Sequence, residues 1–379
     1  MIWLTWRQFR TQAIATLAAL AAFALLIVVT GEHLRHVYDM SDISGCAAHG
    51  GCAHPTVSTF GAHERILSAL LGPALLIVPL LIGMFWGAPL LARELETGSY
   101  RLVWTQSITR TRWLVVKVAI VGLVALAVAG LASWLVSWWY APLDKLNVNR
   151  FDPSVFTERG IVAIGYAGFA FAVGLAAGAI LRRTLPAMAA TFVSFIAARI
   201  IFTFWIRPHL LPAAHAAQQL GAGNAGITGS PQGVSLFATS PTIANAWVYS
   251  GTIVDNAGNA PSAGRIHALL DARCPRIASG PGLPPGSGPG KATATPSVLN
   301  ALFSKCMSSL SHQLHLLVTY QPTSHYWPLQ ALETGIFLAA ALVLIGATVW
   351  RVGRRTARKP AAGEPRERTA NPPALNAAP

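Results

Sequence analysis

The sequence predicts an all-α membrane protein: six transmembrane helices with N- and C-termini cytoplasmic, plus a small extracellular α+β domain between helices 5 and 6. Composition is the first observation behind this class. Of the 379 residues, 53% are hydrophobic and only 11% are charged, whereas an average soluble domain carries about 25% charged residues. The second observation is that the apolar residues gather in six long runs with almost no Asp, Glu, Lys or Arg. A soluble globular enzyme and a disordered chain are therefore excluded.

Residues 1–206 are expected to form a short interfacial helix followed by five spans. Residues 1–10 place apolar and aromatic side chains beside Arg7 and Arg10, a pattern typical of a helix lying in the membrane interface. The next apolar run is longer than the 7–15 residues of a signal-peptide core, so we expect an uncleaved anchor rather than a cleaved leader. A span needs roughly 20 mostly apolar residues. The runs that meet this length are residues 11–31, 66–92, 118–143, 160–181 and 184–206.

Within these spans, glycine spacing and prolines predict local features of helix packing and helix shape. Gly174 and Gly178 have the small-xxx-small spacing that lets two helices approach closely. Pro73, Pro79 and Pro89 lie in the second span, where proline frees backbone carbonyl groups and bends the helix.

Residues 207–326 are long enough for a small folded domain. Residues 242–258 predict a strand, a turn and a second strand, with Ser250-Gly251 as the first turn signal and Asn256 through Gly258 as the second. An amphipathic helix is expected from Ser297, after a Gly/Pro-rich linker at 279–296.

The chain after this domain is predicted to be a sixth span and a tail. Residues 327–350 contain one charge, Glu333, and form the sixth span. Residues 351–379 begin with a basic segment and lack apolar periodicity, so we expect a disordered cytoplasmic tail whose basic part lies against anionic lipid.

The distribution of basic residues predicts the orientation. Arg and Lys are denser in residues 1–10, 93–117, 182–183 and 351–379 than in the alternate connecting segments. Cytoplasmic loops carry such an excess, so these four segments are assigned to the cytoplasm. The net charge of +14 is therefore expected to face lipid headgroups and a protein partner rather than nucleic acid.

The four cysteines all lie in segments assigned to the outside. Such a placement indicates disulfide bonds in an oxidising compartment. Cys46–Cys52 and Cys274–Cys306 are the simplest pairing, because each closes within one loop. A metal site is the alternative for the first loop, since its cysteines and histidines have ligand-like spacing. We favour the disulfide and expect no metal site; the alternative set is Cys46, His49, Cys52 and His54.

The connection between spans two and three, residues 93–117, carries features that topology alone does not require. Two acidic residues and a glycine end the second span, and a short apolar helix is expected before the third. Here the sequence resembles the ABC-2 family of ABC transporter permeases, in particular actinobacterial subunits. The resemblance rests on Glu94, Glu96, Thr97 and Gly98, on Thr109-Arg110 with Lys117 seven residues later, and on the final span in residues 320–350.

The resemblance implies a permease subunit that has no catalytic residues and binds no cofactor directly. ATP and Mg²⁺ would bind a separate ABC ATPase subunit. This subunit would dock on the connection formed by residues 93–117, here called the elbow, with residues 99–110 as the coupling helix. It also implies a second permease subunit, in a homo- or heterodimer, and export of a hydrophobic or amphipathic substrate. The residues assigned to ATPase coupling are Arg93, Glu94, Glu96, Gly98, Arg101, Thr109, Arg110, Arg112 and Lys117.

Two charges lie inside predicted spans, Arg199 and Glu333. Charges within a membrane are costly and are usually paired or functional. Both lie about two turns from the outer boundary, so they either pair with each other or extend separately to the headgroups.

Two other function classes stay open from the residues alone. A membrane sensor or immunity protein would bind a ligand through the outer domain. An integral membrane enzyme would need convergent His, Asp or Glu side chains beside the spans, and Glu333 is the only acid buried in one.

Overall fold

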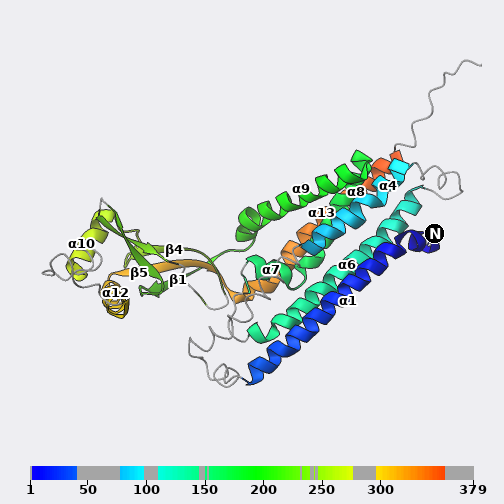
Figure 1. Cartoon of the computed structure of the whole chain (residues 1–379). Coiled ribbons are helices and arrows are strands. Elements are labelled where there is room, and N and C mark those ends of the chain that lie inside the picture. The colour runs from blue at the N-terminus through cyan, green and yellow to red at the C-terminus, as the bar shows by residue number, and fades with distance from the viewer. Residues whose placement is uncertain are drawn as a thin grey trace, which may run out of the picture.

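The computed structural model describes residues 2–40, 77–97, 110–144, 150–151, 153–230, 233–239, 243, 246–275 and 296–354. Within these residues, six helices are long and apolar enough to cross a membrane, and a small group of β-strands and short helices lies beyond one end of the bundle (Figure 1). The predicted class, a mostly helical membrane protein with six spans and a small β-containing region, is confirmed. The candidate spans are Ile14–Met40, Ile77–Thr97, Thr111–Pro142, Val162–Leu181, Thr184–His209 and Thr323–Arg354.

Helix α1 (Ile2–Met40) is one continuous helix, which joins the expected interfacial helix and the first span. It packs on α6 (Arg110–Asp144) through a polar and aromatic contact. Trp139 Nε1 donates to Thr30 Oγ1 at 3.1 Å, and Gly31 leaves room for the ring of Trp138. These two helices run side by side along the outside of the bundle in Figure 1.

The second span contains a π-helical turn, η1 (Gly83–Gly87), before α4 (Ala88–Thr97). Pro89 has no backbone N–H and cannot donate to the carbonyl of Phe85, so the α-helical ladder is interrupted there. The amide of Ala88 instead donates to the Gly83 carbonyl. The regular α-helical pattern of this span is therefore interrupted just before Pro89, whereas Pro73 lies outside the described residues.

Helix α8 (Val162–Leu181) is the centre of the bundle. In the most apolar stretch of α8, 61% of the residues are buried inside the protein, whereas in the corresponding stretch of α1 the share is 11%. Its glycines pack against the π-turn: a Cβ on Gly174 would lie 2.3 Å from the Gly83 carbonyl oxygen, and one on Gly178 2.5 Å from that of Ala88. The close approach predicted from the glycine spacing is confirmed.

Helix α9 (Thr184–Ile201) continues into a π-turn, η2 (Phe202–Ile206), and a 3-10 turn, η3 (Arg207–His209). After the β-strands, η4 (Thr323–His325) leads into α13 (Tyr326–Arg354), which packs along α8. The short helix α7 (Pro153–Glu158) precedes α8.

The β-strands form two small antiparallel sheets. Strands β1 (Ala214–Gln219), β5 (Leu314–Gln321) and β4 (Trp247–Asp255) are ordered β1-β5-β4. Strands β2 (Ala225–Ser230) and β3 (Gly233–Ala238) form a hairpin. Helices α10 (Ala263–Arg273) and α12 (Pro296–Leu310) lie beside them, and α12 confirms the amphipathic helix expected from Ser297.

The predicted turn at Ser250-Gly251 is wrong. Strand β4 runs through both residues and pairs with β5 rather than folding back on itself. The register shifts between Val248 and Ser250, so a bulge absorbs the local irregularity that the sequence pattern presents as a turn. The second turn signal is correct, since Gly258 adopts φ +82° just after β4.

Other predictions fall outside the described residues. These are Cys46–Cys52 and the alternative metal site at Cys46, His49, Cys52 and His54, the coupling helix 99–110 apart from its last residue, the linker 279–296 apart from its last residue, and the tail beyond residue 354.

Candidate functional site

A buried ionic cluster joins α8, η3 and α13 near the end of the bundle that faces the β-strands. Arg207 and Glu333 are 1% and 0% exposed. Arg207 Nε donates to Glu333 Oε2 and Nη2 donates to Oε1, both at 2.9 Å. Tyr166 Oη donates to Glu333 Oε1 and accepts from Arg207 Nη2 at 3.1 Å. Glu333 is therefore held by a bidentate arginine and a tyrosine at once.

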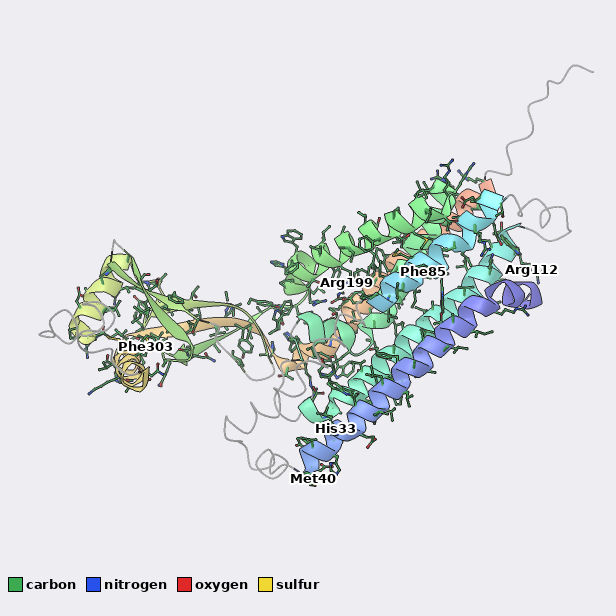
Figure 2. All side chains as sticks on the ribbon, in the orientation of Figure 1. His33, Met40, Phe85, Arg112, Arg199 and Phe303 are labelled. Carbon is green, nitrogen blue, oxygen red and sulfur yellow. A yellow bond between two sulfur atoms is a disulfide. The ribbon has the colours of Figure 1, made fainter. Side chains whose placement is uncertain are left out.

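Arg199, on the part of α9 nearer the β-strands in Figure 2, lies beside this cluster. Its Nη1 is 4.0 Å from Glu333 Oε1, and its guanidinium stacks on the ring of Tyr166 with Cζ 3.8 Å from the centroid. Nη1 is buried and makes no hydrogen bond. Two arginines thus share one carboxylate inside the bundle.

The sequence points to Arg199 and Glu333 but not to Arg207, which lies one residue past the predicted end of span five. The π-turn η2 explains why. Pro208 lacks an N–H, and the amide of Arg207 donates to the Phe202 carbonyl five residues earlier. One extra residue in the turn rotates the following side chain relative to an α-helix, so Arg207 points inward. Pro208, two residues past the turn, is the signal that could have revealed it.

A buried glutamine closes the start of α8 beside the cluster. Gln330 Nε2 donates to the carbonyls of Phe156 and Arg159 at 2.9 and 3.0 Å. Its Oε1 accepts from the amide of Val162 at 2.9 Å. This side chain therefore satisfies an amide at the N-terminus of α8 and two carbonyls at the C-terminal end of α7, groups that helix ends leave unpaired. No pattern in the sequence predicts this role for Gln330.

At the opposite end of the bundle, the predicted elbow residues Glu94 and Lys117 form an ion pair in which Lys117 is buried and Glu94 is partly buried. Lys117 Nζ is 2.5 Å from Glu94 Oε1 and 3.4 Å from the Leu90 carbonyl oxygen. Lys117 also lies over the ring of Trp113, 5.1 Å from its centroid. The pair connects the end of the second span to the beginning of α6.

The neighbouring Glu96 binds a third helix. Its Oε2 accepts from the amide and the hydroxyl of Thr184, at 3.1 and 2.8 Å, at the first residue of α9. A carboxylate at a helix N-terminus is favourable because it meets unpaired amides and the positive end of the dipole. The ends of the second span, α6 and α9 are therefore linked by two acidic side chains.

The remaining elbow residues are not brought into this network. Arg93 and Arg112 are exposed, and Figure 2 shows Arg112 at the end of the bundle away from the β-strands. Gly98, Arg101 and Thr109 lie outside the described residues, as does the side chain of Arg110.

The β-strand region holds the Cys274–Cys306 disulfide, which links the end of α10 to α12. Cys46 and Cys52 are not described. Among the described residues, no group of three or more His, Cys, Asp or Glu side chains is placed to hold a metal ion.

An apolar cavity of about 460 Å³ lies between α1, the second span and α6. Leu20 and Phe23 of α1 face Phe85 and Trp86 of the π-turn across it, and Val128 of α6 closes one wall. Its described lining contains no Asp, Glu, Lys or Arg. Its lining suits an apolar molecule.

Six apolar helices and a buried ionic cluster define an integral, multi-pass membrane protein. A family model described as "ABC-2 membrane transporter related" matches residues 17–207, half of the chain, and the chain belongs to this family. No curated protein and no solved structure matches. The predicted resemblance is confirmed, and the family implies the membrane subunit of a transporter rather than an enzyme, with an ABC ATPase as its general partner. The match ends at Arg207, so the β-strands and α13 lie beyond it.

Proposed function

We propose that the chain is the permease subunit of an ABC-2-type exporter, with both termini in the cytoplasm and the β-strand region outside the cell. A separate ABC ATPase docks on the 93–117 elbow, and a second permease subunit completes the transporter. Family membership supports the permease. The excess of Arg and Lys in residues 93–117 and 351–379 supports the orientation.

The observation that carries the coupling part of the proposal is the Glu94–Lys117 ion pair. It joins the two helices that enter and leave the elbow, and Lys117 is only 6% exposed. Glu96 extends the connection to Thr184 on α9. A push on the elbow by an ATPase would therefore move three helix ends together, as alternating access requires.

The substrate is proposed to be hydrophobic or amphipathic. The cavity between α1, the second span and α6 supports this class, because its volume lies within the roughly 300–1,000 Å³ of small-molecule sites and its lining is apolar. It opens beside η1, and π-turns are frequent at functional sites.

Substitution of Glu94 tests the coupling. Glu94→Gln keeps the side-chain shape but removes the counter-ion of a buried lysine, so we expect permease-stimulated ATP hydrolysis to fall severalfold in proteoliposomes with the co-purified ATPase. The swap Glu94→Lys with Lys117→Glu restores part of the stimulation. Glu32→Gln, the same change at an exposed carboxylate on α1 outside the elbow, is the matched control and leaves stimulation unchanged.

Co-purification separates this proposal from the alternatives. Recovery of an ABC ATPase with the detergent-solubilised chain supports the exporter. Failure to recover one, together with normal membrane insertion, would favour a sensor that uses the β-strand region to bind a ligand. Equal stimulation by wild type and Glu94→Gln would count against the elbow as the coupling site.

A further inference from the structure

A second cavity, of about 790 Å³, lies where the bundle meets the β-strands. The end of α9 approaches the sheet here (Figure 1). One wall comes from η2 and η3, and the other from β4 and β5. The strands lie beyond the residues matched by the family, so this cavity is not explained by the permease fold. Its volume is that of a small-molecule site.

The strand wall is shaped by the bulge in β4. Val248 pairs with Tyr320 and Ser250 with Thr319, so Tyr249 is the extra residue. In a regular strand successive side chains point to opposite faces. Trp247, Val248 and Tyr249 nevertheless all line the cavity, because a bulge re-aims side chains.

Two aromatic rings on this wall are held in place. The rings of Trp247 and Tyr249 meet edge to face with centroids 4.7 Å apart. Tyr249 Oη donates to the Pro208 carbonyl at 3.4 Å, which fastens β4 to the turn after α9. Burial raises the pKa of the Tyr249 hydroxyl, so this donor keeps its proton at neutral pH. The wall is therefore a preformed aromatic surface.

The helical wall offers a third aromatic ring and a polar group. Phe204 is 68% exposed and lines the cavity, whereas its neighbour Trp205 is 64% exposed and does not. His209 Nδ1 donates to the Trp205 carbonyl at 2.8 Å. Because Nδ1 carries the hydrogen, Nε2 of the neutral ring is an acceptor.

The charges nearby restrict the ligand. Among the residues that the structure describes, no Asp, Glu, Lys or Arg lines the cavity. The adjacent Arg207 is buried and its guanidinium is bound to Glu333 and Tyr166, so it is not available to pair with an anion. A charged ligand would lose its hydration without gaining a counter-ion.

We propose that this cavity binds an amphipathic small molecule with an aromatic body and a neutral head that donates a hydrogen bond, such as a hydroxyl. The body lies among Phe204, Trp247 and Tyr249, and the head faces the Nε2 of His209. The site does not depend on ATP hydrolysis or transport, so it stands apart from the proposed exporter function.

Binding of 2-naphthol to the full chain in lipid nanodiscs tests the site, with equilibrium dialysis as the measurement and empty nanodiscs as the background. We expect saturable binding to the chain, and about tenfold weaker binding of 2-naphthalenesulfonate and of 2-methoxynaphthalene, which lack a neutral donor. Loss of one aromatic contact should reduce the affinity by a similar factor. Trp247→Ala and Phe204→Ala should therefore each weaken the binding of 2-naphthol about tenfold. Trp205→Ala is the matched control and should bind as wild type does.

A histidine variant tests the head group separately. His209→Leu removes an acceptor from an exposed side chain, so the fold should persist, which thermal unfolding checks. We expect this variant to bind 2-naphthol and 2-methoxynaphthalene equally. The proposal is overturned if uptake matches empty nanodiscs, if Trp205→Ala weakens binding as much as Phe204→Ala, or if the sulfonate binds more tightly than 2-naphthol.

Discussion

Glu333 balances the positive charges of Arg199 and Arg207 inside the bundle. It accepts hydrogen bonds from Arg207 and Tyr166, while Arg199 remains 4.0 Å away. Removing one member of a buried ion pair leaves a charge without its partner, at a cost of about 3–5 kcal/mol. The stability of this end of the bundle should therefore depend strongly on Glu333, in addition to the separate ion pair of Asp144 with the buried Arg159.

Glu333→Gln is expected to lower the thermal transition of the detergent-solubilised chain markedly, because both arginines lose their counter-ion. Tyr166→Phe should lower it less, since one hydrogen bond to a charged group contributes about 1.5–3 kcal/mol. Differential scanning fluorimetry measures both. Glu32→Gln is the control, because the Glu32 side chain is 64% exposed and 3.8 Å from Arg35. Equal shifts for Glu333→Gln and Glu32→Gln would contradict the cluster's importance.

Asp255 should make the β-strand region sensitive to acid. The amides of Asn259 and Ala257 donate to Oδ1, and Arg265 Nη1 donates to Oδ2, each at 3.0 Å. The hydrogen bond from Asn259, those from Ala257 and Arg265, and the charge of Arg265 hold the pKa of Asp255 below its ordinary value. A carboxyl whose pKa is lowered by folding stabilises the protein above the unfolded pKa of about 3.9 and loses this effect as pH falls through the folded value.

We therefore expect Asp255→Asn to be less stable than wild type at neutral pH, with the difference shrinking as pH falls below about 4. Near-ultraviolet circular dichroism during heating, repeated across pH, measures this dependence. Asp271→Asn, an exposed change on α10, should follow the wild-type profile. A constant difference between Asp255→Asn and wild type at every pH would rule out the proposed linkage.

At the scale of elements, two π-turns place the functional features of the bundle. Each is followed by a proline two residues past its end, Pro89 after η1 and Pro208 after η2. The first turn presents Gly83 to the glycines of α8, and the second turns Arg207 toward Glu333. Long apolar runs predict the helices, but they do not predict these π-turns, which change the direction in which the following side chains face.

The close contact between η1 and α8 should not tolerate a side chain in place of the hydrogen of Gly174. Gly174→Ala would place Cβ 2.3 Å from the Gly83 carbonyl oxygen, and overpacking costs about 1–3 kcal/mol. We expect a lower thermal transition and a lower yield of folded protein in detergent. Gly335→Ala in α13 is the matched control, because nothing lies within 4 Å of the added Cβ and alanine favours a helix by up to about 1 kcal/mol. A Gly174→Ala protein as stable as Gly335→Ala would refute the packing.

At the scale of the whole molecule, the described helices alternate in direction, so the β-strands lie at one end of the bundle and the helix ends that carry Glu94 and Lys117 lie at the other (Figure 1). The proposed orientation places Gly258 outside the cell and Arg93 in the cytoplasm. In a chain without its native cysteines, Gly258→Cys should react with a membrane-impermeant maleimide in intact cells. Arg93→Cys should react only after permeabilisation. The reverse pattern would invert the orientation and move the ATPase site away from the elbow.

The sequence by itself determined the membrane class, the six spans, the family resemblance and the residues Glu94, Lys117, Arg199 and Glu333. These follow from composition and local spacing, which a linear pattern records. Only the tertiary structure decided that Arg207 is the principal partner of Glu333, that β4 pairs with β5 instead of turning at Ser250-Gly251, and that three consecutive β4 residues line one cavity. Each of these depends on a π-turn or a bulge, where one extra residue changes the direction of a side chain. Such a change is stabilised by contacts between segments far apart in the chain, which no local pattern contains.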